Sequence, residues 1–222
     1  MILKGGYESI VRLQIPIHGE LDVPLDHAEA LYAGLCRICP FIHESEDIRI
    51  SPIKGKYTFG NHLIIADRGS FFIQTPAIQL PHILPIAGRA IELGKNRYRL
   101  GTPNIYPLTP AETLAARIVV VRGKQTEKDM QEYLSRAIQI RFGAMLQQDY
   151  LINIMRRRIF TLHSKIIFGF GVVFSELFSE ELSLQIQASD LTGRGKYGAG
   201  FFLPGSFKPA SQTLQASVGE MD

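Results

Sequence analysis

The sequence lacks tryptophan and has only two cysteines in 222 residues, so a scaffold held together by disulfides is excluded. The two cysteines, Cys36 and Cys39, form a C-x-x-C pair. A structural zinc site needs four ligands, and no second cysteine pair is present to supply them. A thioredoxin-like pair begins a helix that follows a strand, whereas this pair comes at the end of a predicted helix. We therefore expect two reduced thiols, partly buried, in a cytoplasmic protein.

The sequence also lacks a long apolar run and a strong excess of one charge. No run approaches the roughly 20 apolar residues of a membrane-spanning helix, and the first residues lack the apolar core of a secretion signal. The formal net charge is only +3, so bulk charge does not require a nucleic-acid partner. The hydrophobic share of 45% is that of a globular protein and excludes a wholly disordered chain.

The first half of the chain has the pattern of a β-α-β-β-α-β unit. Alternating apolar residues predict a strand over 10–17. Asp26 followed by Glu29 resembles a capping box and predicts a helix over 27–39, which Pro40 ends. The remaining expected elements are strands within 47–54 and 62–74, a short proline-broken helix within 77–91 and a closing strand over 97–100.

The same order recurs after a proline-containing segment, residues 102–112, which we interpret as a linker. The elements expected in the second half are a strand over 114–122, a helix capped at Thr126–Asp129, a β-hairpin over 151–160 and 163–175, a helix capped by Ser179 and a last strand over 199–203. The repeat predicts an α+β fold of two tandem ferredoxin-like (RRM-like) domains. Their expected ranges are 1–101 and 113–204, followed by a flexible tail over 205–222.

A glycine-rich segment, residues 193–200, is the first candidate for chemistry. Glycines allow close approach of a ligand to the backbone, and the cations and the aromatic ring among them suit a phosphodiester and a stackable base. The segment lacks the Gly-Lys-Ser/Thr of a nucleotide-binding loop, and it follows a helix, unlike a dinucleotide fingerprint. RNA contact and a simple tight turn remain equal alternatives.

Three consecutive arginines, residues 156–158, form the densest positive cluster, with Lys165 on the facing strand. Alternation along a strand should send Arg156 and Arg158 to one face and Arg157 to the other. No acidic run lies nearby, which favours a phosphate-binding patch. The alternative is a solvent-exposed edge strand whose charges deter aggregation.

The six histidines show no metal-binding spacing, so we expect no metal and no cofactor. His27 lies at the start of the first predicted helix and His43 follows that helix. Imidazole suits proton transfer near neutral pH, although a lone histidine is more often a surface or capping residue.

Two segments resemble the CRISPR-associated endoribonucleases that process precursor RNA, the Cas six family of the RAMP superfamily. The first is DHAEALY at 26–32, with Pro40 and Ile42-His43-Glu44 after it, and the second is SDLTGR at 189–194 with GAGFF at 198–202. The order of the segments between them also matches, and the similarity covers residues 8–204. The short, Cmx-type branch of the family fits this length best.

This resemblance implies tandem ferredoxin-like domains and metal-independent cleavage of CRISPR repeat RNA, in which a hairpin is expected. In such enzymes the 2′-hydroxyl attacks the adjacent phosphate and leaves a 2′,3′-cyclic phosphate and a 5′-hydroxyl. The alternatives are a non-catalytic RAMP subunit that binds CRISPR RNA within an effector complex, and a generic RNA-recognition module. Other subunits of such a complex are therefore possible partners, and a membrane is not.

The resemblance also assigns residue roles. His43 matches the family's acid/base histidine, with His27 as the second choice, while Tyr32 would orient the phosphate and Lys54 or Lys56 would stabilise its charge. The residues assigned to RNA binding are Arg156, Arg157, Arg158, Lys165, Gly193, Arg194, Gly195, Lys196, Tyr197, Gly198 and Gly200. One departure is clear, because Asp190-Leu191-Thr192 stands where the family loop usually opens with Gly-apolar-Gly.

Overall fold

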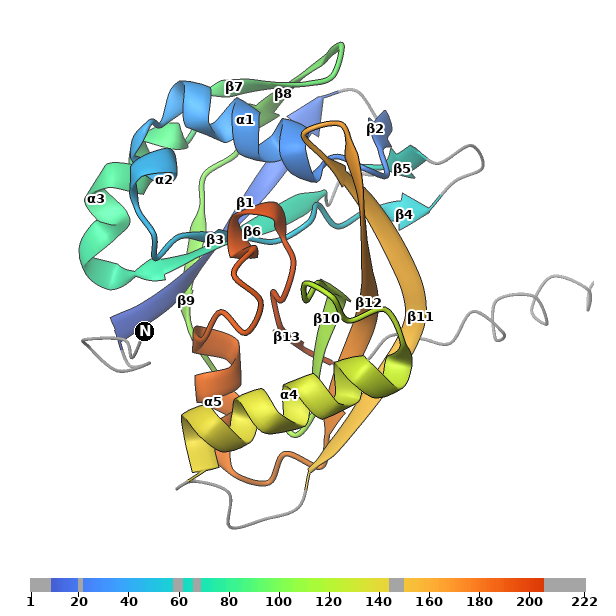
Figure 1. The fold of residues 1–222 in the computed structure, drawn as a ribbon. Helices are drawn as coiled ribbons and strands as arrows, with labels where there is room; N and C mark the ends of the chain where they lie inside the picture. The colour runs from blue at the N-terminus through green and yellow to red at the C-terminus, as the bar shows by residue number, and fades with distance from the viewer. Residues whose placement is uncertain (1–8, 20–21, 58–61, 66–68, 144–149, 206–222) are drawn as a thin grey trace, which may run out of the picture.

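Strand β1 (Ile10–Gly19) is the central element of the first half of the chain in the computed structural model (Figure 1). The structure describes residues 9–19, 22–57, 62–65, 69–143 and 150–205. Strand β6 (Ser70–Pro76) pairs antiparallel with β1 in a register that runs from Ile10↔Pro76 to Pro16↔Ser70. On its other side, β1 pairs with β8 (Asn96–Leu100) near its end and with β9 (Asn104–Pro107) near its start.

The resulting sheet has the order β3-β6-β1-β8-β7, with β3 (Arg49–Ile50) and β7 (Ala90–Leu93) outermost. Leu13 and Ile15 of β1 point to the face that helix α1 (Ala28–Ile38) covers, and Leu31 and Leu35 of α1 are buried with them. The other helical segments here are α2 (Phe41–Glu44), α3 (Leu80–Ile83) and the 3-10 turns η2 (Ala77–Gln79) and η3 (Leu84–Ile86). A side sheet has the order β2 (Asp22–Pro24), β5 (His62–Ile64), β4 (Lys56–Tyr57).

The second half has the predicted β-α-β-β-α-β order. Its elements are β10 (Leu114–Val119), α4 (Glu127–Phe142), β11 (Leu151–Leu162), β12 (Lys165–Ser175), α5 (Glu180–Ala188), the 3-10 turn η5 (Gly195–Tyr197) and β13 (Leu203–Pro204). The antiparallel sheet has the order β11-β12-β10-β13. Met130 and Leu134 of α4 and Ile186 of α5 share one buried core with Phe174 of β12.

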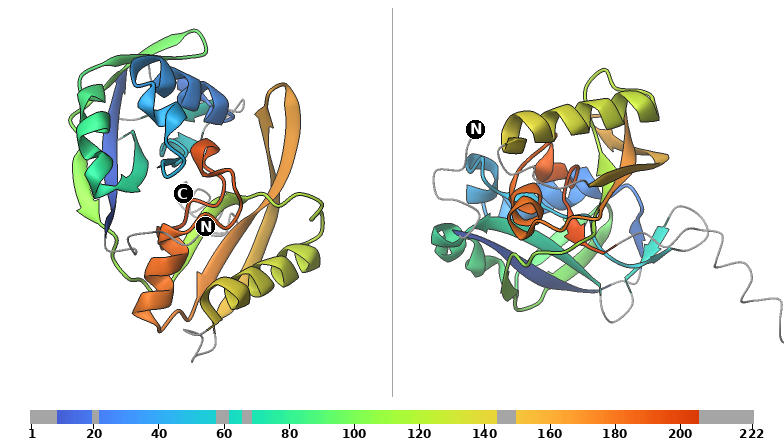
Figure 2. Two further views of the ribbon diagram at one scale, coloured as in Figure 1. Left: turned by 60° about the vertical axis from the view of Figure 1, so that its left-hand side comes forward. Right: turned by 90° about the horizontal axis from the view of Figure 1, so that it is seen from below.

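Buried hydrogen bonds fix the two halves to each other. Arg12 of β1 donates from Nε to Oε1 of Gln74 (2.9 Å) and from Nη2 to the carbonyl oxygen of Phe202 (2.7 Å). Gln74 donates in turn to the carbonyl oxygen of Gln187 (2.8 Å). Burial lowers the pKa of Arg12 to about 10, which still leaves it charged at neutral pH. Figure 2 shows the loop after α5 between the two halves, so both halves shape whatever site lies there.

Two of the three predicted helix caps are confirmed. Thr126 Oγ1 accepts the backbone N–H of Asp129 (3.1 Å), and Ser179 Oγ accepts that of Leu182 (3.2 Å). The predicted cap at Asp26 is wrong, because the N-cap of α1 is His27 and no side chain caps this helix. The carboxylate of Asp26 instead accepts the backbone N–H of Thr161 in the second half (2.7 Å), a contact that local sequence does not encode.

Several predicted boundaries also differ from the structure. Residues 90 and 91, predicted to belong to the proline-broken helix, instead begin strand β7, because Pro81 and Pro85 already end the helical turns and β8 offers a pairing edge. Part of the expected linker forms β9 on β1. The last strand is limited to Leu203–Pro204, since Gly198 and Gly200 have positive φ angles before it. The expected tail beyond residue 205 lies outside the described residues.

None of the helices in the described part of the chain is long and apolar enough to cross a membrane.

Candidate active site

Of the predicted catalytic residues, Tyr32 and His43 are the two whose side chains contact each other. Tyr32 lies on α1, Pro40 ends that helix, and α2 then brings His43 back beside it. The hydroxyl of Tyr32 lies 2.8 Å from Nδ1 of His43, whose side chain is exposed. Burial raises the pKa of Tyr32 to about 12, so the phenol stays protonated and can donate to Nδ1. This contact directs the Nε2 edge of His43 away from Tyr32 and leaves it available for proton transfer.

The glycine-rich segment brings a lysine and a second tyrosine to the same place. Lys196 Nζ donates to the carbonyl oxygen of His43 (2.7 Å). The rings of Tyr197 and Tyr32 are 4.8 Å apart at their centroids and inclined by 59°. Lys196 and Tyr197 were predicted only to bind RNA, and no local signal in the sequence indicated that they would meet His43. The cluster of Tyr32, His43, Lys196 and Tyr197, called here the His43 cluster, therefore combines both halves.

The glycines of this segment serve close packing. Gly198 has a φ of +78°, and a Cβ added there would lie 2.9 Å from Cδ of Pro52. A Cβ at Gly195 would lie 2.8 Å from Cγ of Arg49, and one at Gly200 would lie 2.9 Å from Oγ1 of Thr192. These three glycines are buried, and of the four predicted to contact RNA only Gly193 is exposed. The interpretation of this segment as a tight turn therefore accounts for its buried glycines.

His27 lies inside the protein, with 2% of its surface exposed. Its Nδ1 is 2.9 Å from the carbonyl oxygen of Pro24, and its Nε2 accepts the backbone N–H of Ile53 (2.9 Å). These partners require a neutral ring with its proton on Nδ1. Burial lowers the pKa of His27 to about 4, in agreement with that state. The structure does not bring His27 into the His43 cluster.

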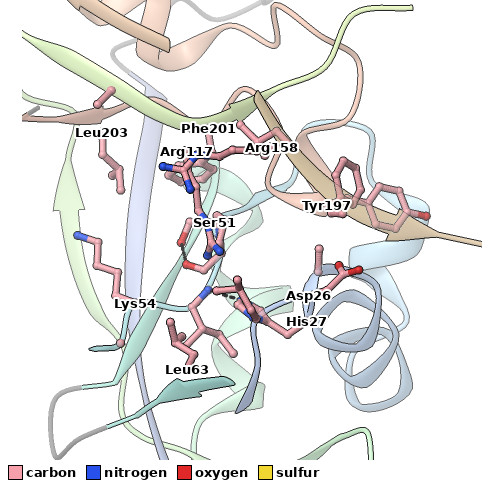
Figure 3. A pocket seen from close by; sticks show the side chains of 18 of the residues that line it. Asp26, His27, Ser51, Lys54, Leu63, Arg117, Arg158, Tyr197, Phe201 and Leu203 are labelled. Carbon is pink, nitrogen blue, oxygen red and sulfur yellow. Dashed lines mark hydrogen bonds between the residues drawn. The ribbon is translucent and has the colours of Figure 1, made fainter. Parts of the chain in front are cut away.

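A cavity of about 850 Å³ lies between the halves and is lined by cations from both (Figure 3). Lys54 points into this cavity, with its ammonium 4.9 Å from the ring centroid of Phe72, rather than towards His43. Burial lowers the pKa of Lys54. The side chain of Lys56, the alternative lysine, lies outside the described part of the structure.

All three residues of the arginine run line the cavity, and Arg117 of β10 joins them. Burial, followed by the charges of Arg117 and Arg156, lowers the pKa of Arg158. The guanidinium of Arg157 lies 4.1 Å from the ring centroid of Phe168. Arg117 was not predicted as a site residue, although a single cation within the apolar run LAARIVVV is a signal that could have indicated it. Lys165 lies at the tip of the hairpin, outside the residues that line the cavity.

The tip of the β11–β12 hairpin is bound to the first turn of α1. Besides the Asp26–Thr161 contact, the carboxylate of Glu29 accepts the backbone N–H of His163 (3.0 Å) and lies 3.0 Å from its Nδ1. Tyr197 is part of the His43 cluster and also lines the cavity. The basic cavity and the exposed imidazole are therefore neighbouring parts of one site. Within the described ranges, no group of three or more histidine, cysteine or acidic side chains is arranged to hold a metal ion.

Comparisons with known proteins identify relatives over nearly the whole chain. A family model described as "Cas6 Crispr" matches residues 11–206. The "CRISPR-associated endonuclease Cas6" of Myxococcus xanthus (strain DK1622) is 30% identical over 200 residues, which cover 90% of this chain and 84% of that protein.

Solved structures share the fold at much lower identity. One, described as "An RAMP protein binding different RNA substrates", has a TM-score of 0.62 at 13% identity and covers 87% of this chain and 98% of its own. Another, described as "Characterization of a Cas6-related gene from Pyrococcus furiosus", has a TM-score of 0.62 at 12% identity and covers 88% and 97%.

Proposed function

The chain belongs to the Cas6 family of CRISPR proteins, and on that premise we propose that it is an endoribonuclease that cleaves CRISPR repeat RNA in precursor transcripts. The observation that carries the proposal is the exposed imidazole of His43, held by Tyr32 and flanked by Lys196. We also interpret the two halves as tandem ferredoxin-like domains, supported by their antiparallel sheets and the shared fold. Within this family, the Cmx-type branch is the finer assignment that we propose.

The proposed reaction is an attack of the 2′-hydroxyl on the adjacent phosphate. A bond forms between the 2′-oxygen and phosphorus, the bond from phosphorus to the 5′-oxygen breaks, and the products are a 2′,3′-cyclic phosphate and a 5′-hydroxyl. We assign to His43 the protonation of the departing 5′-oxygen, for which the ring must be the imidazolium, with a proton on each nitrogen. In that state Nδ1–H donates to the hydroxyl oxygen of Tyr32 and Nε2–H faces the RNA, and transfer of the Nε2 proton leaves a neutral ring. The 2′-hydroxyl proton passes to water or to a phosphate oxygen.

Lys196 supplies the positive charge that the crowded phosphate needs. An ammonium group has three N–H donors, and the His43 carbonyl uses one of them. The remaining donors can bind phosphate oxygens, whose negative charge increases in the transition state. Lys54 then contributes to binding in the cavity instead of to the reacting phosphate. Imidazole, phenol and ammonium together provide proton transfer and charge stabilisation, so the proposed reaction uses no metal ion.

The RNA path follows from the position of Tyr197 between the cavity and the His43 cluster. A strand bound by Lys54, Arg117 and Arg158 in the cavity passes Tyr197 before it reaches His43. The ring of Tyr197 offers a surface on which a base can stack. We accordingly propose repeat RNA as the ligand of both regions, with its backbone bound mainly by the cavity cations.

A repeat RNA with a single 2′-deoxy substitution before the scissile phosphate tests this proposal. We expect the wild-type protein to bind it but not to cut it, because the attacking oxygen is missing, and to cut the unmodified RNA in excess chelator. Gel electrophoresis of the products followed by mass spectrometry identifies their ends. Products with a 3′-hydroxyl and a 5′-phosphate would contradict the chemistry. Failure to cut any cognate repeat would instead favour a non-catalytic RNA-binding subunit.

The cavity arginines are expected to give RNA binding a strong salt dependence. Replacing Arg158 by alanine should weaken binding and reduce the slope of log K against log salt concentration by about 0.7–0.9 if it contacts one phosphate. Lys128→Ala is the control, because Lys128 lies on the exposed surface of α4 and pairs with Glu132 (4.0 Å). Filter binding at several salt concentrations measures both slopes. An unchanged slope for Arg158→Ala would show that Arg158 does not contact a phosphate of the RNA.

A further inference from the structure

The segment that departs from the family's usual glycine pattern has a specific structural role here. We infer that Asp190 is a positioning residue that holds Lys196 and Tyr197 against His43 and Tyr32, an inference that rests on the proposed function. Asp190 lies just after α5 and is neither a residue of the cavity lining nor part of the His43 cluster. Its effect on cleavage must therefore pass through the loop that it stabilises.

The carboxylate of Asp190 organises the start of the glycine-rich loop. Its Oδ1 accepts the backbone N–H groups of Thr192 (2.8 Å) and Gly193 (2.7 Å), and also lies 3.2 Å from Oγ1 of Thr192. Its Oδ2 accepts the backbone N–H of Gly195 (3.3 Å). One side chain thus bonds three loop amides, so this loop conformation does not depend on glycine at positions 190 and 192.

Gly195 is the first residue of the turn that carries the functional side chains. The turn continues with hydrogen bonds from Tyr197 N to Arg194 O (3.0 Å) and from Gly198 N to Gly195 O (3.2 Å). Fixing the Gly195 amide therefore fixes the direction in which Lys196 and Tyr197 leave the backbone. Lys196 then reaches the His43 carbonyl, and Tyr197 packs on Tyr32.

Arg49 of β3 links this loop to the first half of the chain. Its side chain is largely enclosed, and Cγ and Cδ pack against Gly195, where an added Cβ would lie 2.8 Å from Cγ and 3.2 Å from Oδ2 of Asp190. Burial lowers the pKa of Arg49 to about 10, while the nearby charges of Asp190 and Asp47 oppose that shift. The Asp190 carboxylate thus provides both the loop hydrogen bonds and a counter-charge for an enclosed cation from the other half.

Two substitutions separate these contributions. Asp190→Asn keeps an oxygen for Thr192 and Gly193, but its amide nitrogen cannot accept from Gly195 and its charge is lost. Asp190→Ala removes all of the contacts. Thr126→Ala is the matched control, because it also removes a hydrogen bond from a side chain to a backbone N–H in the second half, on α4. It should lower stability without changing the His43 cluster.

We expect both Asp190 variants to lower the single-turnover cleavage rate at saturating RNA by about 10- to 100-fold, because a displacement of about 1 Å at a reacting centre has effects of this size. Their RNA dissociation constants should stay close to that of the wild type. Asp190→Ala combined with Lys196→Ala should lose less activity than the product of the two single losses, since Asp190 acts in part through Lys196. Wild-type rates in the Asp190 variants, or losses that multiply with Lys196→Ala, would overturn the inference.

A second measurement does not depend on cleavage. The ring resonances of His43, assigned with a His43→Gln variant, should shift in Asp190→Asn and stay unchanged in Thr126→Ala. This spectrum tests positioning even if the wild-type protein cuts no RNA, an outcome that would count against the proposed function alone. An unshifted His43 resonance in Asp190→Asn would show that Asp190 does not position the cluster.

Discussion

Replacement of His43 by alanine is expected to abolish cleavage of the cognate repeat while RNA binding remains nearly intact. Positioned proton transfer typically contributes a factor of about 10² to 10⁴ to a rate. In the described part of the site, no other exposed imidazole is hydrogen-bonded to Tyr32 and could replace His43 in that position. The cations that bind RNA lie mainly in the cavity and do not depend on this side chain. Single-turnover rates at saturating RNA, together with dissociation constants for an uncleavable 2′-deoxy repeat, separate the two effects.

His18→Ala is a suitable control for the His43 substitution. His18 is an exposed histidine near the end of β1 and belongs neither to the His43 cluster nor to the cavity lining. It should cut at the wild-type rate. A His43→Ala variant that cuts normally would contradict the role of His43 in proton transfer, although the family membership would stand. A variant that loses both cleavage and binding would show that His43 holds RNA rather than moving a proton.

Much of the fold could be predicted because its signals are local. The alternation in 10–17 predicted the central strand, and Thr126 and Ser179 were recognised as caps because each is hydrogen-bonded within three residues along the chain. The long hairpin followed from two apolar, β-branched runs around a short turn. These elements depend on neighbours in sequence, so composition and spacing are enough to locate them.

The candidate site was less predictable because its decisive contacts join distant parts of the chain. Lys196 meets His43 across 153 positions, and Asp26 bonds to Thr161 across 135. His27 and His43 were equivalent candidates by residue type. What distinguishes them is that the segment around Ile53 packs over His27 and buries it, whereas α2 leaves His43 exposed. No spacing rule contains that information.

His27→Ala should therefore have the opposite effect to His43→Ala and act mainly on stability. Removing the ring leaves the carbonyl of Pro24 and the N–H of Ile53 buried without their partner. Each such group costs about 1–3 kcal/mol, so we expect the free energy of unfolding to fall by about 2–6 kcal/mol. Below its unfolding transition the variant should still cut RNA. Denaturant unfolding and cleavage assays on the same preparation test both parts, and a fully folded His27→Ala that cannot cut would return His27 to the catalytic candidates.

The pH dependence of stability provides a sharper test of the neutral His27. Its pKa is about 4 in the folded protein, whereas a histidine in the unfolded chain titrates near 6.5. Between these values the unfolded chain binds a proton that the folded protein does not, so stability decreases as the pH falls from about 6.5 to about 4. The difference between these two pKa values corresponds to about 3 kcal/mol of stability.

His27→Gln retains a donor and an acceptor but does not titrate, so the difference in stability between wild type and His27→Gln should shrink by that amount over this range. Carboxylate titrations occur in both proteins and cancel in the comparison. A constant difference would show that His27 takes up its second proton at the same pH in the folded protein as in the unfolded chain, and its two hydrogen bonds would then need another explanation.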